Sequence, residues 1–485
     1  MKKEKKEKLK RKNRVLPEKE YDEPVKKEEF LMEEEIEILD ESNPLPIKKS
    51  PLKLAKHKKK KKKLKKWVYL IVFLISAIIV GLVVYLLINN ANKKRLEEGK
   101  RINEERLAEI QSHYNNVVKV NDKSNLYVRN NDNYEIIGYV YKDNVFELGE
   151  TTIDIDTKYF NIKDSDYYIE YQYVDKVEKQ EEYSSRYKKY LPFNKNVVTK
   201  DGFTLYDDDK EVISFNKGME FPIIINNYEN KYYVEYNNRL LSIKKDDVKE
   251  IIDKKNTDKK NRKYITTLAY HRVYDTNEKC NDGYICLKKA SFDKQMKYLS
   301  DNNYLTLTMD EMYMYLKGYL QVEKAVTITF DDGYLYKSAE DVLKKYNLNG
   351  TMFVISGDFK DLTQFDNLEI IDVQSHTHKM HKNYVCSGGN QGGAMLCAGK
   401  TKIMDDLKKS LEALNIKPVA FAYPFYDYND TAISALKELG FKLAFIGRAG
   451  VLGKAYPKST NLYKIPRMTV WEESLMSFNE WKGYL

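Results

Sequence analysis

The chain has 485 residues, which is enough for two to four domains, and a formal net charge of +10. The basic excess lies on one tail, because residues 1–66 hold 24 Lys and Arg against 14 Asp and Glu, and the rest of the chain carries equal numbers of each sign. A nucleic-acid-binding surface is therefore not expected.

Residues 1–66 combine lysine-rich runs with an acidic block and few core-forming side chains, which predicts a disordered tail. Residues 67–88 (WVYLIVFLISAIIVGLVVYLLI) carry no charge and exceed the roughly 20 residues that cross a bilayer core. A buried soluble helix is rarely apolar on every face over such a length. The run also starts too late and is too long for a cleaved signal peptide. We therefore expect one transmembrane helix.

The charges beside this segment predict its orientation. Residues 48–66 carry 12 Lys, whereas residues 89–108 carry six Lys and Arg and four Glu. The positive-inside bias therefore predicts a single-pass cell-membrane protein with a cytoplasmic N-terminus and an extracellular C-terminal part. The lysine run at residues 58–63 is expected to attract anionic membrane lipid.

Two further segments precede the largest predicted domain. Residues 89–115 are charged, free of proline and rich in helix formers, which predicts a helical stalk. Residues 116–252 contain short alternating runs such as YYIEYQYV and KYYVEY, which are typical of strands. The pattern repeats, so we expect two small all-β domains, at 116–180 and 190–252, that resemble bacterial SH3 domains. They would either bind cell-wall glycan or act as a spacer without a ligand.

Strand and helix patterns alternate over residues 260–485. KAVTITF, GTMFVI, KPVAFAYP and FKLAFIG are typical of strands, and KSAEDVLKKY and TAISALKELG of amphipathic helices. This alternation predicts an α/β fold whose parallel sheet is closed or nearly closed into a barrel with helices outside. Functional side chains of such barrels lie at the C-terminal ends of the strands.

Two acidic residues follow one of these strands directly, since TITF runs into Asp331, Asp332 and Gly333. Adjacent side chains of an extended chain point to opposite sides, so one carboxylate could bind a metal while the other faces the substrate. Gly333 would allow a sharp turn. An ordinary exposed Asp-Asp-Gly turn is the alternative.

Three histidines, His376, His378 and His381, follow the strand pattern IIDVQ. On a helix, the five-residue spacing of His376 and His381 would separate them by about 140°, whereas on a loop both could converge on one ion. The pairs His376/His378 and His378/His381 are alternatives, on a strand and on a helical turn. Two histidines and one carboxylate would leave coordination positions open, which suits Zn²⁺ or another divalent transition metal.

All four cysteines, Cys280, Cys286, Cys386 and Cys397, lie in the part expected outside the cell, where disulfides form. Of the three possible pairings we favour the local one, Cys280–Cys286 with Cys386–Cys397, and free thiols are the alternative. No C-x-x-C occurs, which argues against a zinc cluster.

The sequence TFDDG at residues 329–333 matches a motif of the polysaccharide deacetylases, the family-four carbohydrate esterases with a NodB homology domain. SHT with a later His at 375–381 matches their second motif. The five-residue histidine spacing and LAYHRV at 268–273 resemble the branch that deacetylates poly-β-1,6-N-acetylglucosamine. The resemblance covers about residues 264–485. It implies a distorted parallel (β/α) barrel and a hydrolase that acts on carbon–nitrogen bonds other than peptide bonds.

The resemblance also implies roles for the matching residues. Asp332, His376 and His381 would bind the metal, which lowers the pKa of bound water to about 7. Asp331 would be the general base that takes the proton of the attacking water. His271 would be the general acid that protonates the departing sugar amine, so that acetate and a glucosamine residue are the products.

The match to the third family motif is partial. Tyr423, Pro424 and Phe425 match it, and the resemblance implies that a backbone N–H after the proline helps to hold the oxyanion. The arginine usual before that proline is absent, with Ala422 in its neighbourhood, and Tyr426 replaces the usual glycine. No Asp-x-x-Asp-Trp motif occurs.

Arg467 is our candidate for the missing arginine. It lies in YKIPRMTV, the predicted last strand of the barrel, beside the first strand, which carries His271. Arg467 could therefore reach Asp331, lower its pKa and fix its orientation. The alternative is a surface arginine that pairs with a nearby glutamate. Arg272 is the next candidate, although its position beside His271 on a strand should direct it away from the pocket.

Two other functions fit less well. A non-catalytic wall-binding tether would not need the intact metal and base residues, and a metalloprotease would be expected to carry H-E-x-x-H, which is absent. The expected anchor and wall-type domains favour peptidoglycan as the substrate. The histidine spacing favours an exported poly-N-acetylglucosamine.

Overall fold

The computed structural model describes residues 66–113, 117–131, 133–149, 158–177, 185–275, 277–366, 368–447 and 453–485. The chain divides into two units, Met1–Asn89 and Asn90–Leu485. The predicted disordered tail, with its lipid-attracting lysine run, lies outside the described residues except for Lys66.

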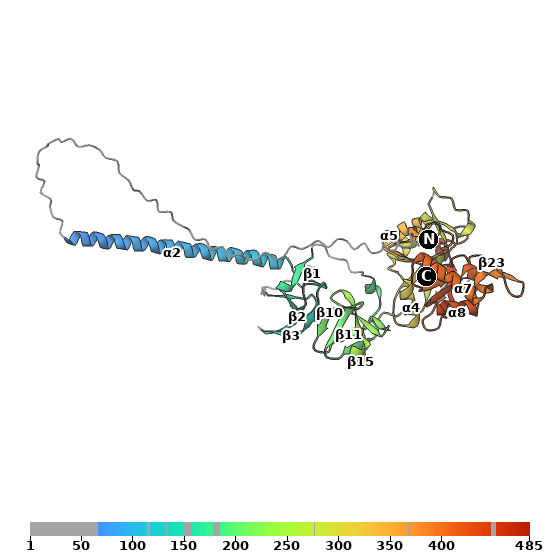
Figure 1. Ribbon diagram of the computed structural model, residues 1–485, viewed down its shortest axis with the longest axis horizontal. Coiled ribbons are helices and arrows are strands. Elements are labelled where there is room, and N and C mark those ends of the chain that lie inside the picture. Colours follow the sequence, from blue (N-terminus) through green and yellow to red (C-terminus); the bar gives the residue numbers. More distant parts are fainter. Residues whose placement is uncertain are drawn as a thin grey trace, which may run out of the picture. The chain divides into compact units, whose positions relative to one another are not determined.

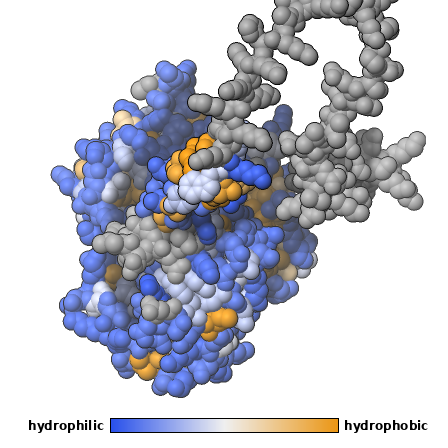
Figure 2. Space-filling view, turned by 90° about the vertical axis from the view of Figure 1, so that its left-hand side faces the viewer, coloured by the Kyte–Doolittle hydropathy of each residue, from blue (hydrophilic) through white to orange (hydrophobic). Residues whose placement is uncertain are grey.

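One helix, α2 (Lys66–Gln111), contains the predicted membrane span and most of the predicted stalk (Figure 1). Large hydrophobic side chains from Trp67 to Ile88 are exposed along it, and the helix is long and apolar enough to cross a membrane. Hydrophilic residues, by contrast, cover most of the molecular face shown in Figure 2.

The region after α2 consists of strands that repeat one arrangement twice. In each half, a first strand lies between two antiparallel partners (β1 between β4 and β7, β8 between β11 and β15), a hairpin follows (β2–β3, β9–β10), and a short 3₁₀ helix precedes the last strand. The strands are β1 (Val117–Val120), β2 (Ser124–Asn130), β3 (Asn133–Val140), β4 (Val145–Glu147), β5 (Tyr159–Asn161), β6 (Tyr167–Glu170), β7 (Val174–Lys176), β8 (Lys195–Thr199), β9 (Phe203–Asp207), β10 (Lys210–Phe215), β11 (Glu220–Pro222), β12 (Ile225–Tyr228), β13 (Lys231–Tyr236), β14 (Arg239–Lys244) and β15 (Val248–Asp253).

The two halves are not independent barrels. Strand β3 pairs with β10, with Val140 opposite Ile213, so both halves contribute to one nine-stranded sheet. Buried side chains of both halves, such as Leu126 and Leu205, belong to one hydrophobic core. This pairing satisfies backbone groups that two separate edge strands would leave exposed.

Seven parallel strands close into a barrel, as the strand–helix alternation predicts. Strand β28 pairs back to β16 and closes the ring, and helices lie outside it (Figure 1). In ring order the strands are β16 (Ile265–Tyr270), β20 (Ala325–Phe330), β21 (Gly350–Val354), β22 (Ile371–Ser375), β25 (Ala420–Ala422), β26 (Leu443–Gly447) and β28 (Ile465–Thr469). The helices are α3 (Lys289–Asp301), α4 (Met309–Lys317), α5 (Lys337–Tyr346), α7 (Lys400–Leu414), α8 (Asp430–Glu438) and α9 (Phe478–Gly483).

Two small insertions at the barrel each carry a disulfide, and both local pairings are confirmed. Cys280–Cys286 joins the preceding loop to the first residue of β18 (Cys286–Lys288), which pairs with β17 (Arg272–Tyr274). Cys386–Cys397 joins the end of the hairpin β23 (Asn383–Val385) and β24 (Gln391–Gly393) to the short helix α6 (Ala394–Cys397). The short strands β19 (Leu305–Thr306) and β27 (Lys454–Ala455) extend the barrel sheet.

Candidate metal and catalytic site

Three side chains suited to metal binding converge beyond the C-terminal ends of β20 and β22. Oδ1 of Asp332 lies 3.7 Å from Nε2 of His376 and 3.6 Å from Nε2 of His381. One ligand atom of each residue lies within 4.8 Å of the others. The structure thus brings together the three residues for which the sequence predicts metal binding.

A backbone carbonyl fixes the orientation of His376. Its Nδ1 lies 2.8 Å from the carbonyl oxygen of Ala422, so Nδ1–H donates there and the Nε2 lone pair faces Asp332 and His381. Burial lowers the pKa of His376 to about 4, although the charge of Asp331 opposes this shift. The ring is therefore neutral, as a metal ligand requires. One carboxylate and two imidazoles fit Zn²⁺ or a similar divalent metal.

The third histidine of the motif points elsewhere. Nδ1 of His378 lies 3.0 Å from the Ser356 hydroxyl. The backbone N–H groups of His378 and Lys379 donate to the Asp406 carboxylate of α7, at 2.7 and 2.9 Å. Thr377 has a left-handed backbone with φ of 80°. This loop explains why residues five apart converge, and neither alternative pair that includes His378 forms.

Asp331 is held by a buried arginine. Nη1 and Nη2 of Arg467 each lie 2.7 Å from one oxygen of the Asp331 carboxylate, and both side chains are buried. Burial alone would raise the pKa of Asp331, but the charge and hydrogen bonds of Arg467 hold this pKa well below its usual range. Arg467 is fully buried, so the surface alternative does not hold.

His271 lies next to this ion pair, just after β16. Its Nε2 is 4.0 Å from Oδ2 of Asp331. Burial lowers the pKa of His271, and the negative charge of Asp331 counteracts part of that shift. Within the described residues its Nδ1 has no hydrogen-bond partner. Two groups able to carry a proton thus lie side by side.

The carboxylates of Asp331 and Asp332 point to different partners, but strand alternation is not the cause. Strand β20 ends at Phe330, one residue before Asp331. Asp332 and Gly333 have left-handed backbones, with φ of 71° and 95°. A turn of this kind disfavours side chains with a Cβ, so Asp332 occupies a strained position. The turn, rather than the pleat, directs Asp331 to Arg467 and Asp332 to the histidines.

The segment that matches the third motif forms a tight turn after β25. Tyr423 is buried, and its hydroxyl donates to the Tyr463 carbonyl at 3.2 Å. Pro424 is buried as well. Phe425 has a φ of 54°, is 49% exposed, and places its ring 4.5 Å from the His381 ring. This turn therefore borders the metal-ligand cluster.

The residue that departs from the motif fills space beside Arg467. The guanidinium carbon of Arg467 lies 5.7 Å from the centre of the Tyr426 ring and 5.6 Å from the centre of the Phe353 ring. The Tyr426 hydroxyl lies 2.9 Å from the Thr469 hydroxyl on β28. An aromatic side chain in place of glycine thus helps to enclose the buried arginine.

Arg272 does not point away from the site, which corrects the expectation from strand alternation. Its Nη1 lies 3.3 Å from Oδ2 of Asp332, and its Nε donates to Asp282. Strand β16 ends at Tyr270 and β17 begins at Arg272, so the chain breaks its pleat at His271. The sequence contains no local signal for this break.

Comparison with known proteins supports the resemblance. Residues 320–444 match the polysaccharide deacetylase family. The chain is 28% identical over 248 residues to a poly-beta-1,6-N-acetyl-D-glucosamine N-deacetylase of Staphylococcus aureus (strain MRSA252), covering 45% of this chain and 82% of that protein. The Staphylococcus epidermidis enzyme of the same name is 29% identical over 250 residues, covering 45% and 83%.

The chain is also similar to a solved structure. The Streptococcus pyogenes deacetylase PplD in complex with acetate is 25% identical, with 46% of this chain and 97% of that chain covered and a TM-score of 0.39. Together, the family match and the relatives show that the C-terminal part of this chain contains a polysaccharide deacetylase domain.

Proposed function

We propose that this protein is a metal-dependent N-deacetylase that removes acetyl groups from an extracellular polysaccharide containing N-acetylglucosamine. One observation carries the proposal. Asp332, His376 and His381 converge within 4.8 Å of one another, beside an Asp331 whose carboxylate is paired with Arg467 at 2.7 Å. A non-catalytic tether would have no use for this buried, paired carboxylate, which is costly to maintain.

The chemistry follows from what these side chains can exchange. A divalent metal, when bound, polarises the amide carbonyl and lowers the pKa of water. Asp331 is ionised and accepts the proton of the attacking water. His271, 4.0 Å from Asp331, donates a proton to the departing amine. The backbone N–H of Phe425, on the turn next to His381, would stabilise the developing oxyanion.

We propose poly-β-1,6-N-acetylglucosamine as the first substrate to test. The support is the similarity to the staphylococcal poly-beta-1,6-N-acetyl-D-glucosamine N-deacetylases, which match about 45% of this chain. Peptidoglycan is the competing substrate, because the repeated β halves resemble wall-binding SH3 domains. We propose that those halves, at 116–180 and 190–252, hold cell-wall glycan, whereas the domain at 260–485 performs the chemistry.

We also propose that residues 67–88 of α2 span the cell membrane, with residues 89–115 as a stalk and the catalytic domain outside. Exposed apolar side chains along this part of the helix support the proposal. A protease added to intact cells should then remove the C-terminal domain. A tag near residue 10 that is lost under the same treatment would reverse the orientation.

Acetate release by the detergent-solubilised full chain tests the activity. We expect release from poly-β-1,6-N-acetylglucosamine that stops with a chelator and returns with Zn²⁺. Asp331→Asn should abolish it. Acetate release from peptidoglycan alone would identify peptidoglycan as the substrate. Glycan binding without acetate release from either polymer would identify a non-catalytic tether.

A further inference from the structure

The two oxygens of Asp332 face different partners. Oδ1 faces the Nε2 atoms of His376 and His381 at 3.7 and 3.6 Å. Oδ2 instead lies 3.3 Å from Nη1 of Arg272. A guanidinium on the second oxygen fixes the rotation of the carboxylate and leaves one oxygen for a metal. A metal held through Oδ1 alone would leave coordination positions open for water and substrate.

Arg272 is itself held from two other directions. Its Nε donates to the carboxylate of Asp282, and its guanidinium carbon lies 4.8 Å from the centre of the Tyr334 ring. The hydroxyl of Tyr334 in turn donates to Asp358 at 3.0 Å. The side chain of Arg272 is only 13% exposed. An arginine constrained on three sides can hold a neighbouring carboxylate in one orientation.

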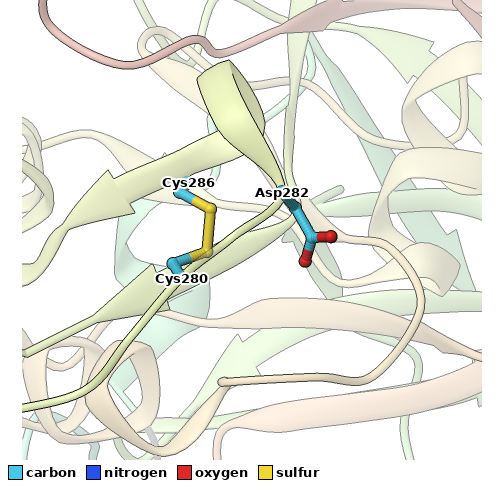
Figure 3. Close-up of side chains that lie close together, drawn as sticks. All are labelled: Cys280, Asp282 and Cys286. Carbon is cyan, nitrogen blue, oxygen red and sulfur yellow. A yellow bond between two sulfur atoms is a disulfide. The ribbon is translucent and has the colours of Figure 1, made fainter.

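A disulfide loop supplies one of these constraints. Asp282 lies between Cys280 and Cys286, which are disulfide-bonded (Figure 3). Strand β17 pairs with β18 so that Arg272 lies directly opposite Cys286. The disulfide thus restrains both the loop that carries Asp282 and the backbone beside Arg272. Because the two sulfurs are bonded to each other, the group of Cys280, Asp282 and Cys286 offers no thiolate ligand for a second metal ion.

We propose that Arg272 is a positioning residue for the metal site and that the Cys280–Cys286 loop sets its position through Asp282. This proposal rests on the proposed metal-dependent function, since Asp332 is the ligand that Arg272 orients. Hydrogen-bond partners of metal ligands commonly change metal affinity by about 10–100-fold when they are removed.

Zinc affinity of the full chain in detergent, measured by competition with a chromophoric chelator, tests the proposal without relying on activity. Arg272→Met should weaken Zn²⁺ binding by about 10–100-fold, and Arg272→Lys should restore part of it. Asp282→Asn and the paired change Cys280→Ser with Cys286→Ser should give smaller losses. Arg262→Met is the matched control, because Arg262 precedes β16, at the end of that strand opposite to Arg272, and donates to the backbone oxygens of Tyr264 and Leu485.

Double variants show whether the loop acts through Arg272. Adding Asp282→Asn to Arg272→Met should cause no further loss of zinc affinity. Unchanged affinity in Arg272→Met, an additive loss in the double variant, or a wild-type chain without zinc affinity would overturn the proposal. If zinc binding depends on Arg272 but the wild-type chain releases no acetate, the positioning role stands and the proposed activity fails.

Discussion

Replacing Arg467 by Met tests how the buried ion pair prepares the catalytic base. Methionine keeps most of the side-chain bulk but removes the charge and both 2.7 Å hydrogen bonds to Asp331. Breaking a buried pair by removing one partner costs about 3–5 kcal/mol. We therefore expect a lower unfolding midpoint for the variant, measured on the full chain in detergent.

The same change should alter the pH dependence of turnover. The active form of Asp331 is the carboxylate, so the acid limb of the pH–rate profile reports its pKa. Burial raises this pKa and Arg467 lowers it. Without an adjacent cation the pKa should rise by at least about 1–3 units, and the acid limb should move upward with it. Turnover at neutral pH should fall by about 10²-fold or more, with unchanged zinc content.

The sign of the stability effect follows from linkage. The pKa of Asp331 is lower in the folded state, so its contribution to stability is present above the usual aspartate pKa and is lost as the pH falls through the folded-state value. The stability difference between the wild-type chain and Arg467→Met should therefore shrink in acid.

A double variant provides the control. Combining Arg467→Met with Asp331→Asn removes both charges, so its loss of stability should be smaller than the sum of the two single losses. Its turnover should remain as low as that of Asp331→Asn. Normal turnover with an unmoved acid limb in Arg467→Met, or additive stability losses in the double variant, would refute the reasoning.

Three other predictions concern the histidine loop, the base and the hairpin. His381→Ala should abolish zinc retention, whereas His378→Ala should keep it because that ring contacts Ser356 instead; zinc content that follows His378 would contradict this assignment. Asp331→Asn should retain zinc and lose acetate release, and a parallel loss of zinc would mean that the two carboxylates have been assigned the wrong roles. Replacing Cys386 and Cys397 by Ser should lower stability by about 3 kcal/mol for a loop of this size, measured as a shifted unfolding midpoint, and an unchanged midpoint would argue against it.

Local sequence patterns determined the elements of the barrel. Helix α5 occupies Lys337–Tyr346, the span that its apolar spacing predicts, and ends where Asn347 adopts a left-handed backbone. The strands could also be predicted from the sequence, because parallel strands buried on both faces form continuous apolar runs. Strand order in a barrel then places the last strand next to the first. The first strand, β16, also pairs with β20, which ends just before Asp331, so these two neighbouring pairs bring Arg467 within reach of Asp331.

Contacts between segments far apart in the sequence decided the features that local patterns did not predict. The pairing of β3 with β10 merges the two β halves into one sheet. It depends on which strand edges of the two halves come together, and neither segment carries a sequence pattern that predicts it. The left-handed turns at Asp332 and Thr377 are stabilised by surrounding structure, including the Asp406 carboxylate that accepts two N–H bonds. Arg272 reaches Asp332 because the pleat breaks at the preceding residue. Sequence periodicity describes regular backbone, so it fails where tertiary contacts hold the chain in irregular conformations.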